Sequence, residues 1–145
     1  MGETDPILER LEDQINWYGR RSSYNRRMYK WLKGVEIVAA ALVPLAAGFH
    51  FPAALTGSLG VLIAVLEGLL QLNQYLQNGI SYRSTCEALK HEKYLYLASA
   101  GPYATDDRAH AHAKLAERVE SLVSQENSQW TAVQERQAQP KEAGS

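Results

Sequence analysis

The chain has 145 residues, and its 15 Lys and Arg nearly balance its 16 Asp and Glu, so its formal net charge is -1. This length suits a single domain, and the charge balance argues against a nucleic-acid partner, because no basic excess is present to neutralise phosphates. A mean hydropathy of -0.33 is typical of a soluble protein, but the apolar residues gather in the middle of the chain with the charged residues on both sides.

The first predicted element is an amphipathic cytoplasmic helix over residues 5–31. Asp5 can cap its N-terminus, and the proline that follows fits the first helical turn. Gly19 and the Ser22-Ser23 pair weaken the helix, so we expect a kink or break near them. Apolar residues recur at helical spacing and form one stripe: Ile7, Leu8, Leu11, Ile15 and Tyr18.

Two apolar stretches follow, over residues 33–51 and 53–72. The first contains Glu36, and the second has Glu67 as its only formal charge. Crossing a hydrocarbon core of about 30 Å takes about 20 predominantly apolar residues in a helix. A short turn joins the stretches, and the charged segment before them does not resemble a cleavable signal peptide. The sequence therefore predicts a two-helix transmembrane hairpin.

The flanks of the predicted hairpin determine its expected orientation. Cations flank both spans and are missing from the turn: Arg20, Arg21, Arg26, Arg27, Lys30, Lys33, Arg83, Lys90 and Lys93. The positive-inside rule then places both termini in the cytoplasm, for a multi-pass protein of the inner (plasma) membrane. The alternative is a soluble bundle in which both central helices are buried, and the lack of a polar face on either stretch argues against it.

The rest of the chain is also predicted to be helical. Nothing stops the second helix before Gly101-Pro102, so we expect it to continue to about residue 99. Thr105-Asp106-Asp107 can cap a last cytoplasmic helix over residues 105–136, and residues 137–145 form a polar tail that we expect to be disordered. The predicted fold class is an all-α membrane protein that forms a symmetric homo-oligomer.

Glu36 and Glu67 are the first candidate functional residues. Each lies fifteen residues from the turn, which places both about 22 Å below the outer surface, at similar depth in the bilayer. A charge at that depth costs a few kcal/mol, about 2.5–3.5, unless it faces protein or water. The functional interpretation is a ring of carboxylates at the cytoplasmic mouth of an oligomeric cation pore. The structural alternative is pairing with Lys30, Lys33 or a neighbouring hydroxyl.

A stripe of small and polar residues on the second span accompanies Glu67. Its members recur every three or four residues and share one helical face: Thr56, Gly60, Ala64, Glu67, Gln71, Gln74 and Asn78. Small residues allow helices to approach closely, and amides can bond across helices or line water. The stripe predicts self-association, either around a pore or in a sealed helix seam.

Motifs for catalysis or metal binding are weak. His91-Glu92 begins like a zinc-protease signature, but Leu95 stands where the second histidine is needed. His110 and His112 face different sides of a helix, and Cys86 has no base partner nearby in the sequence. We therefore expect no enzyme activity, no cofactor and no metal.

Three segments resemble a known bacterial family. They are Leu8-Glu-Arg-Leu-Glu-Asp-Gln-Ile-Asn-Trp-Tyr, the region from Leu66 to Tyr103 with Tyr-Arg-Ser-Thr-Cys-Glu-Ala-Leu-Lys at its centre, and Ser124-Gln-Glu-Asn-Ser-Gln-Trp. The family is a two-transmembrane group of unknown function related to SLATT domains, the SMODS and SLOG-associating effectors. The resemblance implies a helical hairpin with cytoplasmic helices and the cytoplasmic motif positions Tyr82, Arg83, Glu87, Lys90 and Glu92.

The function implied by SLATT domains is that of a pore-forming effector in bacterial conflict systems, gated by a nucleotide-sensing partner. Our first hypothesis is therefore an oligomeric, cation-leaning ion-conducting membrane protein. The second is a non-conducting membrane-anchored scaffold whose cytoplasmic helices recruit a partner. The expected partners are the lipid bilayer, further copies of the chain, inorganic cations and a cytoplasmic signalling protein.

Overall fold

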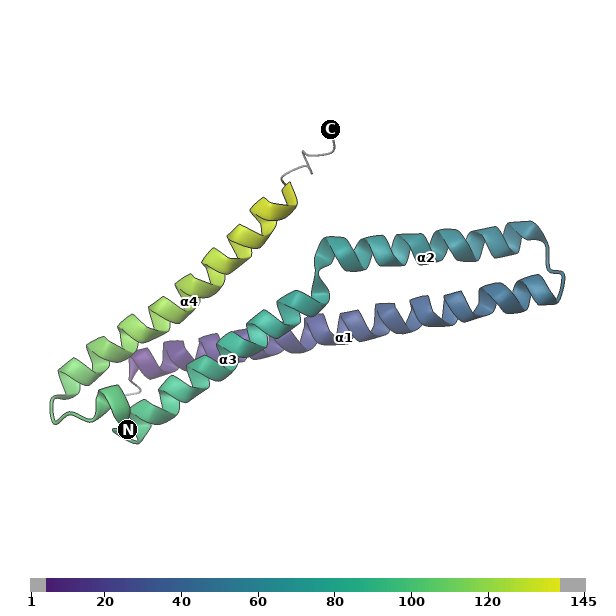
Figure 1. The fold of residues 1–145 in the computed structure, drawn as a ribbon. Coiled ribbons are helices and arrows are strands. Elements are labelled where there is room, and N and C mark those ends of the chain that lie inside the picture. Colours follow the sequence, from purple (N-terminus) through teal and green to yellow (C-terminus); the bar gives the residue numbers. More distant parts are fainter. Residues whose placement is uncertain (1–4, 139–145) are drawn as a thin grey trace. The chain divides into compact units, whose positions relative to one another are not determined.

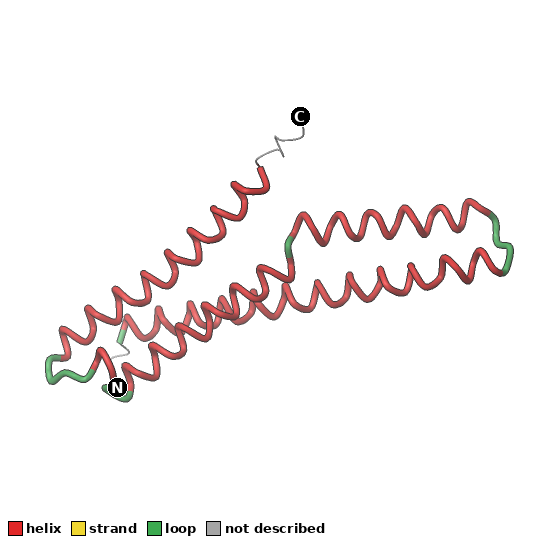
Figure 2. Tube along the Cα trace, viewed as in Figure 1, coloured by secondary structure: helices red, strands yellow, loops and turns green. Residues whose placement is uncertain are grey.

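The computed structural model describes residues 5–138, which form α-helices and no strand (Figures 1 and 2). These helices are α1 (Pro6–Gly48), α2 (Ala53–Asn73), α3 (Tyr75–Leu97) and α4 (Arg108–Ala138), with a short 3-10 helix, η1 (Gly101–Tyr103), before α4. The chain divides into two compact units. Unit 1 combines the start of α1 with the segment from Ser81 onward, and unit 2 is Arg21–Ile80. The all-α prediction is confirmed.

Helix α1 is one unbroken helix of 43 residues. The sequence predicted two helices here, over residues 5–31 and 33–51, with a kink or break near Gly19, and the division into two helices and the break were wrong. Pro44 is also accommodated inside α1. The weak helix formers are tolerated because helices in proteins draw most of their stability from tertiary packing.

Packing against α3 explains why the helix continues through the residues expected to break it. In unit 1, Gly19 lies beside Cys86: a Cβ added at Gly19 would be 3.6 Å from Cys86 Sγ, an ordinary van der Waals contact. In unit 2, the Ser22 hydroxyl is buried and donates a hydrogen bond to the Gly79 carbonyl at 2.9 Å. The residues that weaken an isolated helix are therefore the ones that pack here.

A break at Gln74 separates α2 from α3 and corrects the prediction of a second helix running to residue 99. Gln74 adopts a left-handed conformation (φ 44°, ψ 39°), and its N–H donates to the Leu70 carbonyl at 3.1 Å. The Asn78 side-chain amide donates to the Asn73 carbonyl at 3.0 Å. A left-handed non-glycine residue is uncommon, and no glycine or proline marks this position in the sequence.

The expected cap of the last helix is confirmed, with a small shift. Asp107 Oδ1 accepts hydrogen bonds from the backbone N–H groups of Ala109 (2.9 Å) and His110 (3.3 Å). The helix runs from Arg108 to Ala138 rather than over residues 105–136, so the first two residues of the predicted tail are helical. The rest of that tail, residues 139–145, lies outside the described residues.

Unit 1 has a continuous apolar core that joins α1, α3, η1 and α4. Leu11, Leu89 and Leu115 are fully buried, and burying a leucine side chain is worth about 1.5–3 kcal/mol. The predicted apolar stripe of residues 7–18 and the apolar residues of α4 between Leu115 and Val123 belong to this core or pack against it. The start of α1 therefore packs with α3 and α4 around one core.

Unit 2 contains the α1–α2 hairpin, whose small core consists of Leu32, Leu66 and Leu70. The turn between the helices includes His50 at φ 57°. Both hairpin helices are long and apolar enough to span a membrane. Their large aliphatic side chains point mostly outward: Ile37, Val38, Leu42, Leu45, Val61, Leu62, Val65, Leu69 and Leu72 are exposed.

Candidate functional site

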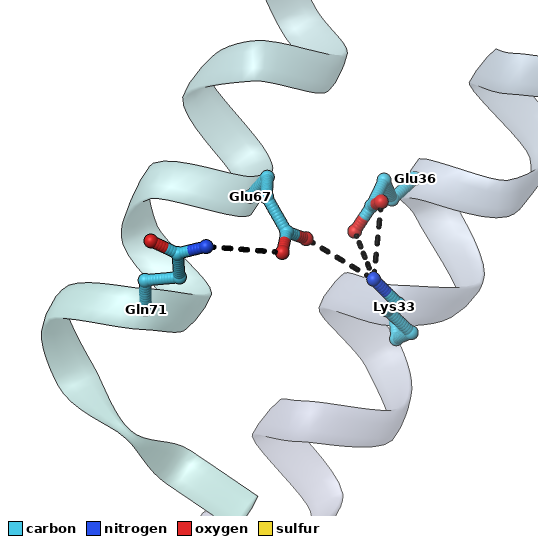
Figure 3. A network of polar contacts seen from close by, with 4 residues as sticks. All are labelled: Lys33, Glu36, Glu67 and Gln71. Carbon is cyan, nitrogen blue, oxygen red and sulfur yellow. Dashed lines mark hydrogen bonds and ion pairs between the residues drawn. The ribbon is translucent and has the colours of Figure 1, made fainter.

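A polar network joins the two helices of the hairpin (Figure 3). Lys33 Nζ, from α1, lies 3.1 Å from both carboxylate oxygens of Glu36 and 3.1 Å from Glu67 Oε2, which comes from α2. Gln71 Nε2 donates to Glu67 Oε1 at 3.5 Å. One ammonium group therefore bridges two carboxylates that are 31 positions apart in the chain.

The network is only partly covered by protein. The side chain of Glu36 is 15% exposed, whereas those of Lys33 and Glu67 are 36% and 44% exposed. Ion pairs this exposed to water contribute little to stability, but in hydrocarbon an unpaired charge costs several kcal/mol. One ammonium group against two carboxylates leaves a formal charge of -1. The arrangement can hold the two helices together and attract a cation.

The sequence placed Glu36 and Glu67 at the same depth, and their shared bond to Lys33 confirms that they lie at one level of the hairpin. Pairing with Lys33 was the structural alternative to a ring of carboxylates, and this pairing is present. Glu67 Oε1, the oxygen that does not face Lys33, accepts a longer hydrogen bond from Gln71 at 3.5 Å.

The predicted polar stripe is not one continuous helical face. Thr56, half-buried in the first turn of α2, and Gln71 belong to the same helix as Glu67. Gln74, however, occupies the left-handed break, and Asn78 belongs to α3. The stripe is interrupted because the break changes the helical phase after Asn73.

The predicted motif residues on α3 take different roles. The ring of Tyr82 stacks at an angle on Trp17 and Tyr18, with centroids 5.8 and 5.9 Å away. The Glu87 carboxylate lies 3.9 Å from Arg83 and 3.2 Å from Lys90, and its hydrogen bond raises the pKa of Lys90. These ion pairs are exposed and resemble ordinary helix-surface pairs.

Glu92, the last motif residue, belongs to a buried network that sequence reasoning missed. Its carboxylate accepts hydrogen bonds from the Tyr103 hydroxyl at 2.5 Å and from Arg118 at 3.0 Å. Burial, together with the Glu92 carboxylate, raises the pKa of Tyr103. The network ties α3, η1 and α4 together, and no local pattern in the sequence links residues this far apart.

Two further carboxylates have tertiary partners in unit 1. Glu126 is buried and accepts a hydrogen bond from the Tyr18 hydroxyl at 3.3 Å. Burial raises the pKa of Glu126, and burial with the nearby carboxylate raises the pKa of Tyr18 to about 12. Asp5 Oδ2 lies 2.5 Å from His112 Nε2.

Within residues 5–138, no group of three or more His, Cys, Asp or Glu side chains could hold a metal ion.

Comparison with known proteins places the chain in a family. No curated protein and no solved structure matches it. Residues 13–111 match the family described as "Protein of unknown function (DUF4231)". The matched region takes in α1 from residue 13 onward, all of α2, the Lys33 network and the motif residues of α3. Because this region covers well over half of the sequence, the chain belongs to the DUF4231 family of unknown function.

Proposed function

We propose that this protein is an integral membrane protein that crosses the bilayer as the α1–α2 hairpin. The observation that carries the proposal is the outward-facing aliphatic surface of both helices. In their most apolar stretches only 17% and 11% of the residues are buried, whereas a core helix of a soluble protein is mostly buried. Exposed apolar surface of this extent marks contact with lipid or with another protein.

The distribution of cations supports an orientation with both termini in the cytoplasm. Lys and Arg cluster before the first span and after the second, and the turn between the spans has none. By its resemblance to SLATT-related proteins, we assign the chain to a bacterial inner membrane.

We further propose that several copies of the hairpin associate and conduct cations. A net charge inside the bilayer has to face water or a polar partner, and the Lys33–Glu36–Glu67 network carries one negative charge in excess. Two spans cannot enclose a water-filled path, so the water that the network faces must lie in a pore formed by a ring of several copies. Glu67, the more exposed carboxylate, would then lie at the inner mouth and concentrate cations.

The test is ion flux through the purified full-length protein in liposomes, with the oligomer mass measured on the same preparation. Glu67→Gln brings the formal charge of the network to zero, so we expect a weaker preference for cations. Lys33→Gln leaves two unpaired carboxylates, so we expect a stronger one. Glu135→Gln removes a carboxylate on α4, outside the hairpin, and serves as the matched control.

Opposite shifts of the reversal potential in the two network variants, with an unchanged control, would support the pore. Unchanged potentials in both variants would remove the network from the conduction path. Flux from monomeric protein would contradict the oligomeric arrangement.

The second candidate function is a non-conducting membrane-anchored scaffold. The observation that favours it is the pairing itself, since Lys33 bonds both carboxylates within one chain and can serve simply to hold the hairpin together. Unit 1 also exposes Tyr94 and Trp130 as contact points for a cytoplasmic signalling partner. Two results together would support this function over the pore. The oligomer would be intact but show no ion flux, and the full-length protein would bind a cytoplasmic partner that the Tyr94→Ser or Trp130→Ser variant no longer binds.

A further inference from the structure

A surface of cations and aromatic rings lies on α1 shortly before its apolar stretch. Arg27 lies three residues after Tyr24, and Lys30 and Trp31 lie three and four residues after Arg27, so all four fall on one side of the helix, which we call the basic–aromatic surface. Tyr24 is 53% exposed and Trp31 is 64% exposed, and both cations are exposed as well. The buried residues of the same segment lie on the other side of the helix: Ser22, Asn25 and Leu32.

The positive charge of this surface is not compensated. No Asp or Glu occurs between Asp13 and Glu36. Arg27 and Lys30 form no ion pair with any residue from 5 to 138. Lys33, one turn further along, is by contrast held by two carboxylates. Uncompensated cations clustered on one helix side create a field that attracts an anionic partner.

The position of the surface along α1 indicates which anion it meets. With Glu36 about 22 Å below the outer surface, a hydrocarbon core of about 30 Å ends about five residues earlier in α1, near Trp31, so Lys30 and Arg27 lie about 2 and 6 Å outside it. The polar headgroup layer on each side of a bilayer is about 5–8 Å thick. Indole and phenol rings favour this layer, and long cationic side chains reach lipid phosphates there.

We infer that the basic–aromatic surface binds the phosphate groups of anionic phospholipids in the leaflet next to it. The inference rests on the proposed membrane insertion and adds the lipid class that the protein selects. Arg27 and Lys30 contact the phosphates, and Trp31 anchors the helix at headgroup level. Each cation near an anionic membrane strengthens binding by about fivefold, the equivalent of about 1 kcal/mol.

The test counts bound lipids by native mass spectrometry on the full-length protein in a non-ionic detergent, after incubation with equal amounts of phosphatidylglycerol and phosphatidylcholine. We expect the wild type to retain phosphatidylglycerol preferentially. In the Arg27→Gln/Lys30→Gln variant, the ratio of bound phosphatidylglycerol to bound phosphatidylcholine should fall by about fivefold for each charge removed. The Lys114→Gln/Arg136→Gln variant loses the same charge from α4 and should behave as the wild type. Added salt should weaken the preference, since screening acts on exposed charges.

Three results would overturn the inference: no preference in the wild type, an unchanged preference in the Arg27→Gln/Lys30→Gln variant, or equal losses in both variants. Binding of a DNA duplex through Arg27 and Lys30 that phosphatidylglycerol fails to displace would also overturn it in favour of nucleic acid. Alkaline carbonate extraction of cell membranes reports separately on insertion. Release of the wild-type protein from the membranes by carbonate would refute the membrane hairpin. The mass-spectrometric count of bound lipids would still decide whether the basic–aromatic surface binds anionic headgroups.

Discussion

Removing the Tyr103 hydroxyl tests whether the buried Glu92 network holds unit 1 together. Tyr103 is 1% exposed and Glu92 is 6% exposed, and their oxygens lie 2.5 Å apart. Tyr103→Phe keeps the ring and creates no cavity. It deletes one hydrogen bond to a buried carboxylate and leaves the bond from Arg118 in place.

A hydrogen bond to a charged group is worth about 1.5–3 kcal/mol. Because Arg118 still pairs with the carboxylate, we expect a cost at the lower end, about 1.5–2 kcal/mol. Glu92→Gln makes the acceptor neutral, so in that background the same change should cost only about 0.5–1 kcal/mol. The two residues should therefore show a coupling free energy of about 1 kcal/mol in a double-mutant cycle.

Amide hydrogen exchange on the full chain in detergent measures these free energies locally, on peptides of α3 and α4. Tyr94→Phe is the matched control, because Tyr94 is 66% exposed and surface changes usually stay within about 0.5 kcal/mol. A Tyr103→Phe cost as small as that of the control would refute the reasoning. So would a cost that is the same with Glu92 and with Gln at position 92.

Two further predictions concern one packing contact in each unit. Burial raises the pKa of Glu126, so folding favours its protonated form, and the stability it contributes is lost as the pH rises through the folded-state pKa. Glu126→Gln should therefore raise the melting temperature at neutral pH but not in acid, and an equal effect at both pH values would contradict this. In unit 2 a Cβ at Gly79 would lie 2.9 Å from Arg26 Cγ, so Gly79→Leu should cost about 1–3 kcal/mol by hydrogen exchange. Gly34→Ala, which meets no atom within 4 Å, should not destabilise.

Sequence alone was sufficient for features that depend on neighbouring residues. The all-α class, the apolar stripes, the short turn after Gly48 and the cap at Asp107 all follow from periodicity and local hydrogen-bonding chemistry. That Glu36 and Glu67 lie at one level of the hairpin also came from counting residues along two helices. Membrane insertion, orientation and conduction stay predictions.

Only the tertiary structure decided the features that depend on residues far apart in the chain. Gly19 and Ser22 were predicted to break α1, but contacts with Cys86 and with the Gly79 carbonyl make them packing residues. The left-handed Gln74 has no signal in the sequence, because glutamine seldom adopts that conformation.

The same distinction applies to the candidate site. The sequence by itself determined that two carboxylates lie within apolar helices and that cations flank them. The tertiary structure decided that one ammonium group, Lys33, is shared between Glu36 and Glu67, and that Glu92 is buried against Tyr103. The physical reason is that helix periodicity depends on residues within a few positions, whereas burial and shared hydrogen bonds depend on how helices pack together.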